Sequence, residues 1–163
     1  MAEAYSEAEL IGGQRLTDKD VQAIAALMQH LAGNKSLPAK SLEQLRWHYE
    51  MVLAQGAYWV VVRDSGGTIV SMAIMTPHLL AEYVGKRFAT VNDVSTLRAH
   101  EGRGLGKRVM RKLFQVAREK KFDHVDWTSS KTGAQAFYEG STMQGWGVQR
   151  RHTRTYRWTP GGT

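Results

Sequence analysis

Hydrophobic positions in the first third of the chain recur mostly at helical spacing. From Val21 to Leu31 apolar residues return every three to four positions, and Thr17 precedes this stripe as a typical helix N-cap. Residues Ser41 to Gln55 show the same spacing. We therefore predict two helices here, preceded by a short strand around Glu9 to Leu16.

The middle of the chain changes to strand character. Tyr58–Arg63 and Thr68–Thr76 are largely apolar runs that flank the tight turn Asp64–Gly67, which predicts a β-hairpin. The loop Pro77–Arg87 separates this hairpin from a run rich in β-branched residues, Phe88–Leu97. This part of the chain therefore predicts three consecutive strands.

The last third alternates between helices and strands. One helical stripe consists of Leu105, Val109, Leu113 and Val116. A strand at His124–Thr128, a short helix at Gly133–Glu139 and a final strand or pair of strands follow. The order predicts one α/β domain over residues 1–163, with a mixed, mostly antiparallel sheet and helices on both of its faces. We expect residues 1–7 and 159–163 to be loose termini.

Composition supports this picture, and charge adds to it. Of the 163 residues, 42% are hydrophobic and 23% charged, which is ordinary for a globular domain. The absence of cysteine excludes disulfides, thiolate metal sites and a cysteine nucleophile. With no apolar run of membrane-spanning length and an acidic, alanine-containing start, we expect a cytoplasmic protein. The formal charge of +7 favours an anionic ligand or partner.

The basic stretch Gln149–Trp158 makes nucleic acid one candidate partner, because it mixes arginines with aromatic residues. As a single strand, however, it would divide these residues between two faces. One face would carry Arg151, Thr153, Thr155 and Arg157, and the other Arg150, His152, Arg154, Tyr156 and Trp158. We therefore interpret the stretch as a solvated sheet edge and expect no nucleic acid partner.

The glycine-rich turn Glu101–Gly106 (EGRGLG) is the most informative segment for function. Glycines let the backbone approach a ligand closely, and the helix that follows offers unpaired N–H groups and the positive end of its dipole. The turn therefore predicts a seat for an anion, most naturally a diphosphate, although it could simply cap the helix. Its even spacing matches neither the phosphate-binding loop of nucleotide hydrolases nor the dinucleotide fingerprint.

This spacing resembles the acyl-CoA-binding motif of the GNAT superfamily of N-acetyltransferases, Gln/Arg-x-x-Gly-x-Gly/Ala. Val91–Gly106 resembles the family's strand four, pyrophosphate loop and helix start. His124–Tyr138 resembles its strand five and the helix that carries its tyrosine, and Arg151–Arg157 resembles the final strand of one branch. The resemblance covers roughly residues 8–158 and implies the GNAT fold.

Three positions depart from the family pattern. Glu101 stands where the family usually has Gln or Arg, which places a carboxylate beside the expected phosphates. Lys131 replaces the Asn that often begins the tyrosine helix. The Gly-Phe pair that usually follows this helix corresponds to Gly147–Val148 here, displaced along the chain by about five extra residues. The backbone cradle is retained in spite of these changes.

The resemblance implies that acetyl-CoA lies where strands four and five diverge, with backbone groups of the chain binding its pantetheine arm and its pyrophosphate. The implied pantetheine residues are Val94, Ser95, Thr96 and Leu97. The implied pyrophosphate residues are Gly102, Arg103, Gly104, Leu105, Gly106, Lys107 and Arg108. For the side chains of Thr96 and Leu97, simple packing is the alternative.

The expected chemistry is direct attack of a neutral amine on the thioester within a ternary complex, which requires a group that accepts the amine proton. Asp93, acting directly or through water, is the first candidate; the family's sugar-phosphate branch has Glu-Asp-Val where this chain has Asn92-Asp93-Val94. The alternative is that Asp93 only hydrogen-bonds within the fold.

The resemblance also implies a general acid. Tyr138 follows Ala134–Phe137 in the family's Ala-x-x-Phe-Tyr pattern, in which the tyrosine hydroxyl faces the thioester sulfur. A tyrosine with an ordinary pKa of ~10 is protonated at neutral pH and suits this role. The alternative is that Tyr138 packs on Phe137 with its hydroxyl at the surface.

The sequence therefore predicts an N-acetyltransferase that takes acetyl-CoA as co-substrate, needs no metal and acetylates a primary amine of a small molecule or protein. The alternatives are a GNAT-fold protein that binds acyl-CoA without turnover and an enzyme that acetylates RNA or aminoacyl-tRNA. No membrane partner is expected, and a homodimer is left open. The loops Gly33–Lys40 and Pro77–Arg87 would shape the acceptor pocket, and neither contains a motif that identifies the acceptor.

Overall fold

The structure is a computed structural model that describes residues 4–129, 132–152 and 155–161. Lys131, Thr153 and Arg154, as well as the side chain of His152, lie outside the described residues. The elements are β1 (Glu9–Ile11), α1 (Asp18–Ala32), α2 (Leu42–Ala54), β2 (Tyr58–Arg63), β3 (Ile69–His78), β4 (Phe88–Thr96), the 3-10 helix η1 (Arg98–His100), α3 (Leu105–Glu119), β5 (His124–Thr128), α4 (Thr132–Glu139), α5 (Ser141–Gly145), β6 (Val148–His152) and β7 (Thr155–Trp158).

The strands form a seven-stranded sheet in the order β1-β2-β3-β4-β5-β7-β6. β1 pairs with β2, β2 with β3, and β7 with both β5 and β6 in antiparallel fashion, whereas β4 and β5 are parallel. The prediction of a mixed, mostly antiparallel sheet is confirmed. The chain divides into two compact units. The first consists of Met1–Met75 and Asp93–Leu113, and the second of Thr76–Asn92 and Phe114–Thr163.

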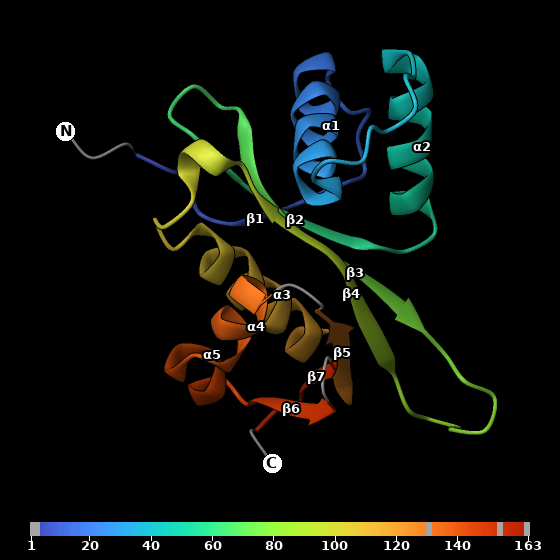
Figure 1. The fold of residues 1–163 in the computed structure, drawn as a ribbon. Coiled ribbons are helices and arrows are strands. Elements are labelled where there is room, and N and C mark those ends of the chain that lie inside the picture. The colour runs from blue at the N-terminus through green and yellow to red at the C-terminus, as the bar shows by residue number, and fades with distance from the viewer. Residues whose placement is uncertain (1–3, 130–131, 153–154, 162–163) are drawn as a thin grey trace. The chain divides into compact units, whose positions relative to one another are not determined.

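In the first unit, α1 and α2 lie side by side over one face of β1, β2 and β3 (Figure 1). Both helices begin where the sequence predicts. The Thr17 hydroxyl accepts a hydrogen bond from the Asp20 N–H at 3.1 Å, and Ser41 and Gln44 form a reciprocal capping box. Their apolar stripes meet the strands in a buried core that includes Val21, Ile24, Leu27, Tyr49, Trp59, Val61, Met72 and Ile74.

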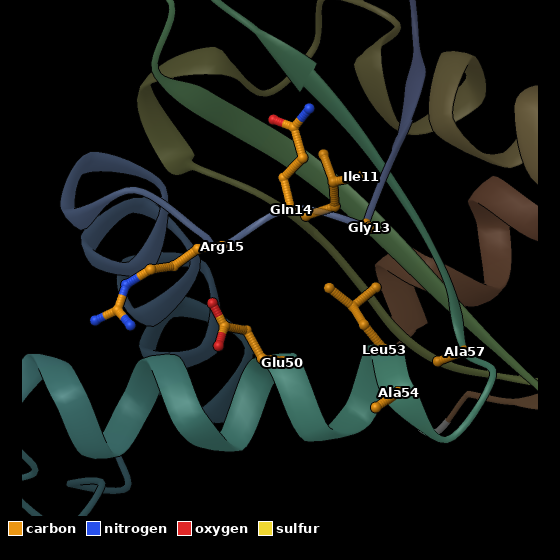
Figure 2. Close-up of a pocket in the computed structure, with 9 residues that line it drawn as sticks. Ile11, Gly13, Gln14, Arg15, Glu50, Leu53, Ala54 and Ala57 are labelled. Atoms are coloured by element: carbon orange, nitrogen blue, oxygen red, sulfur yellow. The ribbon is translucent and has the colours of Figure 1, made fainter.

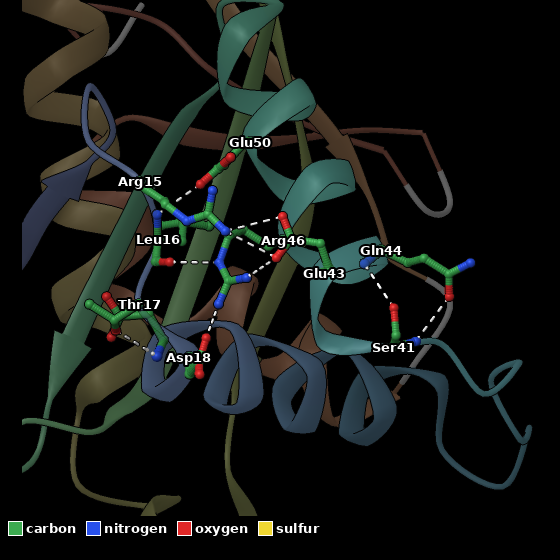
Figure 3. A network of polar contacts seen from close by, with 10 residues as sticks. Arg15, Leu16, Thr17, Asp18, Ser41, Glu43, Gln44, Arg46 and Glu50 are labelled. Atoms are coloured by element: carbon green, nitrogen blue, oxygen red, sulfur yellow. Dashed lines mark hydrogen bonds and ion pairs between the residues drawn. The ribbon is translucent and has the colours of Figure 1, made fainter.

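A buried arginine ties the segment between β1 and α1 to α2 (Figure 3). Arg46 is only 5% exposed and donates hydrogen bonds to the carbonyl oxygen of Leu16 and to the carboxylates of Asp18 and Glu43. One turn further along α2, Glu50 accepts a hydrogen bond from the Leu16 N–H at 2.9 Å. Residue Leu16 is therefore held through both of its backbone groups.

The N-terminal part of the first unit differs from two expectations. β1 ends at Ile11 rather than near Leu16, because Gly12 and Gly13 follow it with positive φ values of 146° and 76°. The expectation of a loose terminus over residues 1–7 is wrong at Ser6. Its N–H donates to the carbonyl of Arg63 and its hydroxyl accepts from the Arg63 N–H, both at 2.9 Å.

The second unit is built around an aromatic core. Phe114 stacks on Trp158 with ring centroids 5.0 Å apart, and Trp127 stacks on Tyr156 at 6.0 Å. β5, with bounds His124–Thr128, forms as the sequence predicts. α5 was not predicted; it occupies the extra residues that follow the tyrosine helix.

The stretch Gln149–Trp158 forms two antiparallel strands, the second of the two possibilities that the sequence left open, although we assigned its residues to faces as those of a single strand. Tyr156 and Trp158 are fully buried in the aromatic core, whereas Arg150 and Arg151 are exposed on β6, the last strand of the sheet. The face assignment made for one strand was therefore wrong. The aromatic residues that suggested stacking on nucleic acid bases serve the core instead.

Candidate functional site

The glycine-rich turn lies between η1 and α3, in the strand–turn–helix context that the sequence predicts. Gly102 and Gly104 adopt positive φ values of 74° and 77°, which side-chain-bearing residues rarely adopt. A Cβ atom built on either glycine would meet nothing within 4 Å. The turn therefore presents bare backbone to open space at the start of a helix.

Unpaired amides line this helix start. The first α-helical bond of α3 runs from the Arg108 N–H to the carbonyl of Gly104, at 3.1 Å. Within the described residues, the N–H groups of Leu105, Gly106 and Lys107 donate no hydrogen bond. With the helix dipole behind them, these three amides form a seat for an anion.

The charges around the seat are mostly positive. Arg103 and Lys107 are exposed, and Arg108 is half-buried. Glu101, the departure from the family pattern, is engaged by His30 of α1, whose Nε2 lies 2.9 Å from a carboxylate oxygen. This contact turns the carboxylate toward α1, and sequence reasoning missed it because the two residues are 71 positions apart.

The hydrogen bonds of β4 narrow the predicted pantetheine site. The Leu97 N–H donates to the carbonyl of Val70 on β3 at 2.9 Å, so it is already in use. Backbone groups alternate sides along a strand, so Ser95 also faces β3, whereas Val94 and Thr96 face the opposite edge. On that opposite edge, β4 pairs with β5 only at Phe88–Thr90. The outward-facing backbone groups of Val94 and Thr96 are therefore not part of the β4–β5 pairing.

Two of the predicted side chains have structural tasks. The buried Ser95 hydroxyl donates to the Leu27 carbonyl of α1 at 3.0 Å, and the Thr96 hydroxyl lies 2.8 Å from that of Ser71. These contacts agree with the packing alternative for Thr96. A role in ligand binding for Thr96 would therefore rest on its backbone groups, whereas those of Ser95 face β3.

Asp93 lies on β4 in the first unit and is half-buried. Burial raises the pKa of its carboxyl group above the ordinary value, because the apolar surroundings disfavour the charged form. An aspartate with a raised pKa is a stronger base than an exposed one. The position therefore suits proton abstraction at neutral pH.

Tyr138 lies on α4 in the second unit and is 6% exposed. Its ring contacts Trp127, Phe137 and Tyr156, with centroid distances of 5.3, 5.1 and 5.2 Å. Burial, and to a lesser degree the neighbouring Tyr156, raise the pKa of its hydroxyl. The side chain packs on Phe137 as the alternative interpretation proposes, but within a buried aromatic cluster.

A cavity of about 590 Å³ lies in the first unit between the segment that follows β1 and the second half of α2 (Figure 2). It is lined by Ile11, Gly12, Gly13, Gln14, Arg15, Glu50, Leu53, Ala54 and Ala57. The lining mixes apolar residues with polar ones, and its carboxylate, Glu50, already accepts a hydrogen bond from Leu16. None of the site residues predicted from the sequence is among these residues.

The described residues contain no cluster of three or more His, Cys, Asp or Glu side chains that could hold a metal ion. Likewise, no helix in the described parts of the chain is long and apolar enough to cross a membrane.

Comparisons with known proteins agree with this geometry. A family model described as the Acetyltransferase (GNAT) family matches residues 24–141. The structure is similar to an acetyltransferase from Trypanosoma brucei, with a TM-score of 0.69 and 24% identity over 90% of this chain and 97% of that one. No curated protein matches the chain.

Two further solved structures share the fold. Glucosamine-6-phosphate N-acetyltransferase from Arabidopsis thaliana has a TM-score of 0.67 and 16% identity, over 90% of this chain and 98% of that one. An aminoglycoside acetyltransferase from an uncultured soil metagenomic sample, in complex with trehalose, has a TM-score of 0.63 and 21% identity, over 90% and 93%. At such identities these likenesses support the fold alone.

Proposed function

Because the chain belongs to the acetyltransferase (GNAT) family, we propose that it transfers an acetyl group from acetyl-CoA to a primary amine. The observation that carries this proposal is the set of three unpaired amides at Leu105, Gly106 and Lys107 behind two glycines with positive φ. Such a seat suits a diphosphate, and acetyl-CoA is an acyl donor that contains one.

In this proposal the cofactor binds along β4 and the glycine turn. The amides of Leu105–Lys107 hold the diphosphate, and Arg103, Lys107 and Arg108 supply positive charge. The backbone groups of Val94 and Thr96 are those that remain for the pantetheine arm, because the Leu97 N–H is used by Val70. The carboxylate of Glu101 is hydrogen-bonded to His30 of α1 and is thereby directed toward that helix.

The amine must lose a proton for the reaction to proceed, because an alkylammonium ion has no lone pair with which to attack. Asp93 takes this proton, directly or through a water molecule. The neutral amine nitrogen bonds to the thioester carbon and a tetrahedral oxyanion forms. The nitrogen, positively charged after the attack, releases its second proton to solvent, and the oxyanion collapses as the carbon–sulfur bond breaks. The raised pKa of Asp93 makes its carboxylate a better proton acceptor than an exposed one.

Tyr138 donates a proton to the departing sulfur. Its hydroxyl is protonated throughout the neutral range and so has a proton to donate, although burial raises its pKa and makes it a weaker acid than an exposed tyrosine. The acyl group passes directly to the amine, because a chain without cysteine cannot form a thioester intermediate on a thiol of its own.

A nitrogen acceptor fits the names of proteins with the same fold. One is a glucosamine-6-phosphate N-acetyltransferase and another an aminoglycoside acetyltransferase. An RNA acceptor is less well supported, because Tyr156 and Trp158 are buried and not available for base stacking. We therefore propose a small molecule or a protein as the acceptor.

Calorimetric titration of the full chain with acetyl-CoA tests the cofactor part of the proposal. We expect one site with a Kd between about 1 μM and 1 mM, the range in which enzymes usually meet their substrates. A titration with no heat and no rise in melting temperature at millimolar acetyl-CoA would refute the proposed donor.

A further inference from the structure

The N-terminal segment of the chain runs beside the glycine turn. Ser6 is fixed to the end of β2 by its two hydrogen bonds with Arg63. From this fixed position its carbonyl accepts a hydrogen bond from Nη1 of Arg108, in the first turn of α3, at 2.8 Å. The segment therefore connects the sheet directly to the start of the helix that carries the anion seat.

The residue before Ser6, Tyr5, contacts Arg103 of the glycine turn. Its hydroxyl accepts a hydrogen bond from Nη1 of Arg103 at 3.0 Å and lies 3.0 Å from Nδ1 of His100. The ring stands edge-on to the His100 ring, with centroids 5.8 Å apart, and the Arg103 guanidinium carbon lies 6.0 Å from the tyrosine centroid. Arg103 lies between two glycines, and its side chain is exposed.

Holding an arginine in place before its ligand arrives has a physical effect. A free arginine side chain loses much rotamer freedom when it is fixed, and this loss weakens binding. An arginine already held by a partner avoids most of that loss. Its planar guanidinium can then bind phosphate oxygens through paired N–H groups.

We propose that Tyr5 is a positioning residue that holds Arg103 at the glycine turn for the phosphate groups of the cofactor. The inference rests on the proposed function, since it assumes an acyl-CoA at the turn. The diphosphate and the 3′-phosphate of CoA have the same chemistry toward a guanidinium. Arg103 can bind either group, and dephospho-CoA, which lacks the 3′-phosphate, distinguishes the two.

The test compares Tyr5→Phe, which keeps the ring and removes only the hydroxyl, with Arg103→Gln, by calorimetry with CoA. We expect each change to weaken CoA binding about 3- to 10-fold, as loss of one hydrogen-bonded contact implies. The double variant should be no weaker than Arg103→Gln alone, because Tyr5 acts through Arg103. Tyr83→Phe, a change at an exposed tyrosine of the second unit, is the matched control and should bind CoA normally.

Two shorter probes separate positioning from a general structural role. Pantetheine has no phosphate, so its binding, followed by NMR at millimolar concentration, should be the same in Tyr5→Phe and wild type. Dephospho-CoA lacks only the 3′-phosphate. If Tyr5→Phe binds dephospho-CoA as tightly as the wild type does, Arg103 binds the 3′-phosphate of CoA. If Tyr5→Phe binds dephospho-CoA more weakly than the wild type does, Arg103 binds the diphosphate. Both results support the inference.

Several results would overturn the inference. One is normal CoA binding by Tyr5→Phe when the wild type binds; the proposed function would then still stand. Equal weakening of CoA and pantetheine would show that Tyr5 only supports the fold. Additive effects in the double variant would show that Tyr5 does not act through Arg103. If the wild type binds no CoA at all, the proposed function fails, and the inference fails with it.

Discussion

Gly104 provides a substitution whose effects on folding and on binding can be calculated separately. Its φ is +77°, and a Cβ atom at this position would meet nothing within 4 Å. Gly104→Ala therefore causes no clash in the free protein, and its cost is conformational. An L-residue in the left-handed region costs about 1–2 kcal/mol, which lowers the melting temperature of a chain of this size by roughly 2–8 °C.

The effect on cofactor binding should be larger than this strain suggests. The methyl group would occupy the space through which a phosphate approaches the amides of Leu105–Lys107. Losing one hydrogen bond between a backbone amide and a charged oxygen costs about 1.5–3 kcal/mol, which weakens acetyl-CoA binding about 10- to 100-fold. Calorimetric titration of the folded variant measures this directly.

Gly85 supplies the matched control. It has the same φ of +77° and also has nothing within 4 Å of an added Cβ, but it lies in the loop between β3 and β4. Gly85→Ala should show a similar loss of melting temperature and an unchanged acetyl-CoA affinity. If Gly104→Ala binds acetyl-CoA like the wild type, or if both alanine variants lose affinity equally, the anion seat is not at the glycine turn.

Other positions give further expected outcomes. Tyr138→Phe should lower turnover by ~10²-fold or more with nearly unchanged acetyl-CoA affinity, measured under conditions where chemistry limits the rate; normal turnover would remove Tyr138 from the mechanism. Asp93→Asn should also lower turnover by ~10²-fold or more and should unfold at a higher temperature than the wild type at neutral pH. The folded-state pKa of Asp93 is raised, so the stability of the wild type falls as the pH rises from the ordinary aspartate pKa to the folded-state pKa. Below the ordinary aspartate pKa, Asp93 is protonated in both the folded and the unfolded protein, and the stability gain of Asp93→Asn should vanish. An Asp93→Asn variant that gains no stability at neutral pH would contradict the burial argument. Arg46→Met should lower the free energy of unfolding by about 1–3 kcal/mol, since it leaves the Leu16 carbonyl without its donor; an unchanged denaturation midpoint would show that the contact contributes little. Acetyl-CoA binding should weaken with added salt, while random oligonucleotides compete poorly; submicromolar binding of such oligonucleotides at physiological salt would favour a nucleic acid partner.

The parts of the fold with strong local signals could be predicted from the sequence. Thr17 and Ser41 fix the starts of α1 and α2 because caps depend on neighbouring residues alone. The boundary between β6 and β7 could not be predicted, because residues 153–154 are Thr and Arg and contain no turn signal. α5 has five residues, too few to show a helical period.

The site shows the same division between local and long-range information. The positive φ values of Gly102 and Gly104 agree with the glycine spacing, which is a local pattern. The contacts of His30 with Glu101 and of Tyr5 with Arg103 join residues 71 and 98 positions apart, and no local pattern indicates them. The hydrogen bonds of Ser6 with Arg63 and Arg108 hold the chain next to Tyr5 beside the turn.

The proposed acetyl transfer to an amine is tested most directly by following CoA release across a panel of amine acceptors. Because the chain has no cysteine, a thiol reagent such as dithionitrobenzoate reports only the CoA that is set free. We expect release that depends on both acetyl-CoA and one class of primary amine, with an acetyl group found on the amine nitrogen by mass spectrometry. Tight binding of acetyl-CoA without amine-dependent release, across sugar amines, polyamines, amino acids and peptide amines, would contradict the proposed transfer and indicate a protein that binds acyl-CoA without turnover.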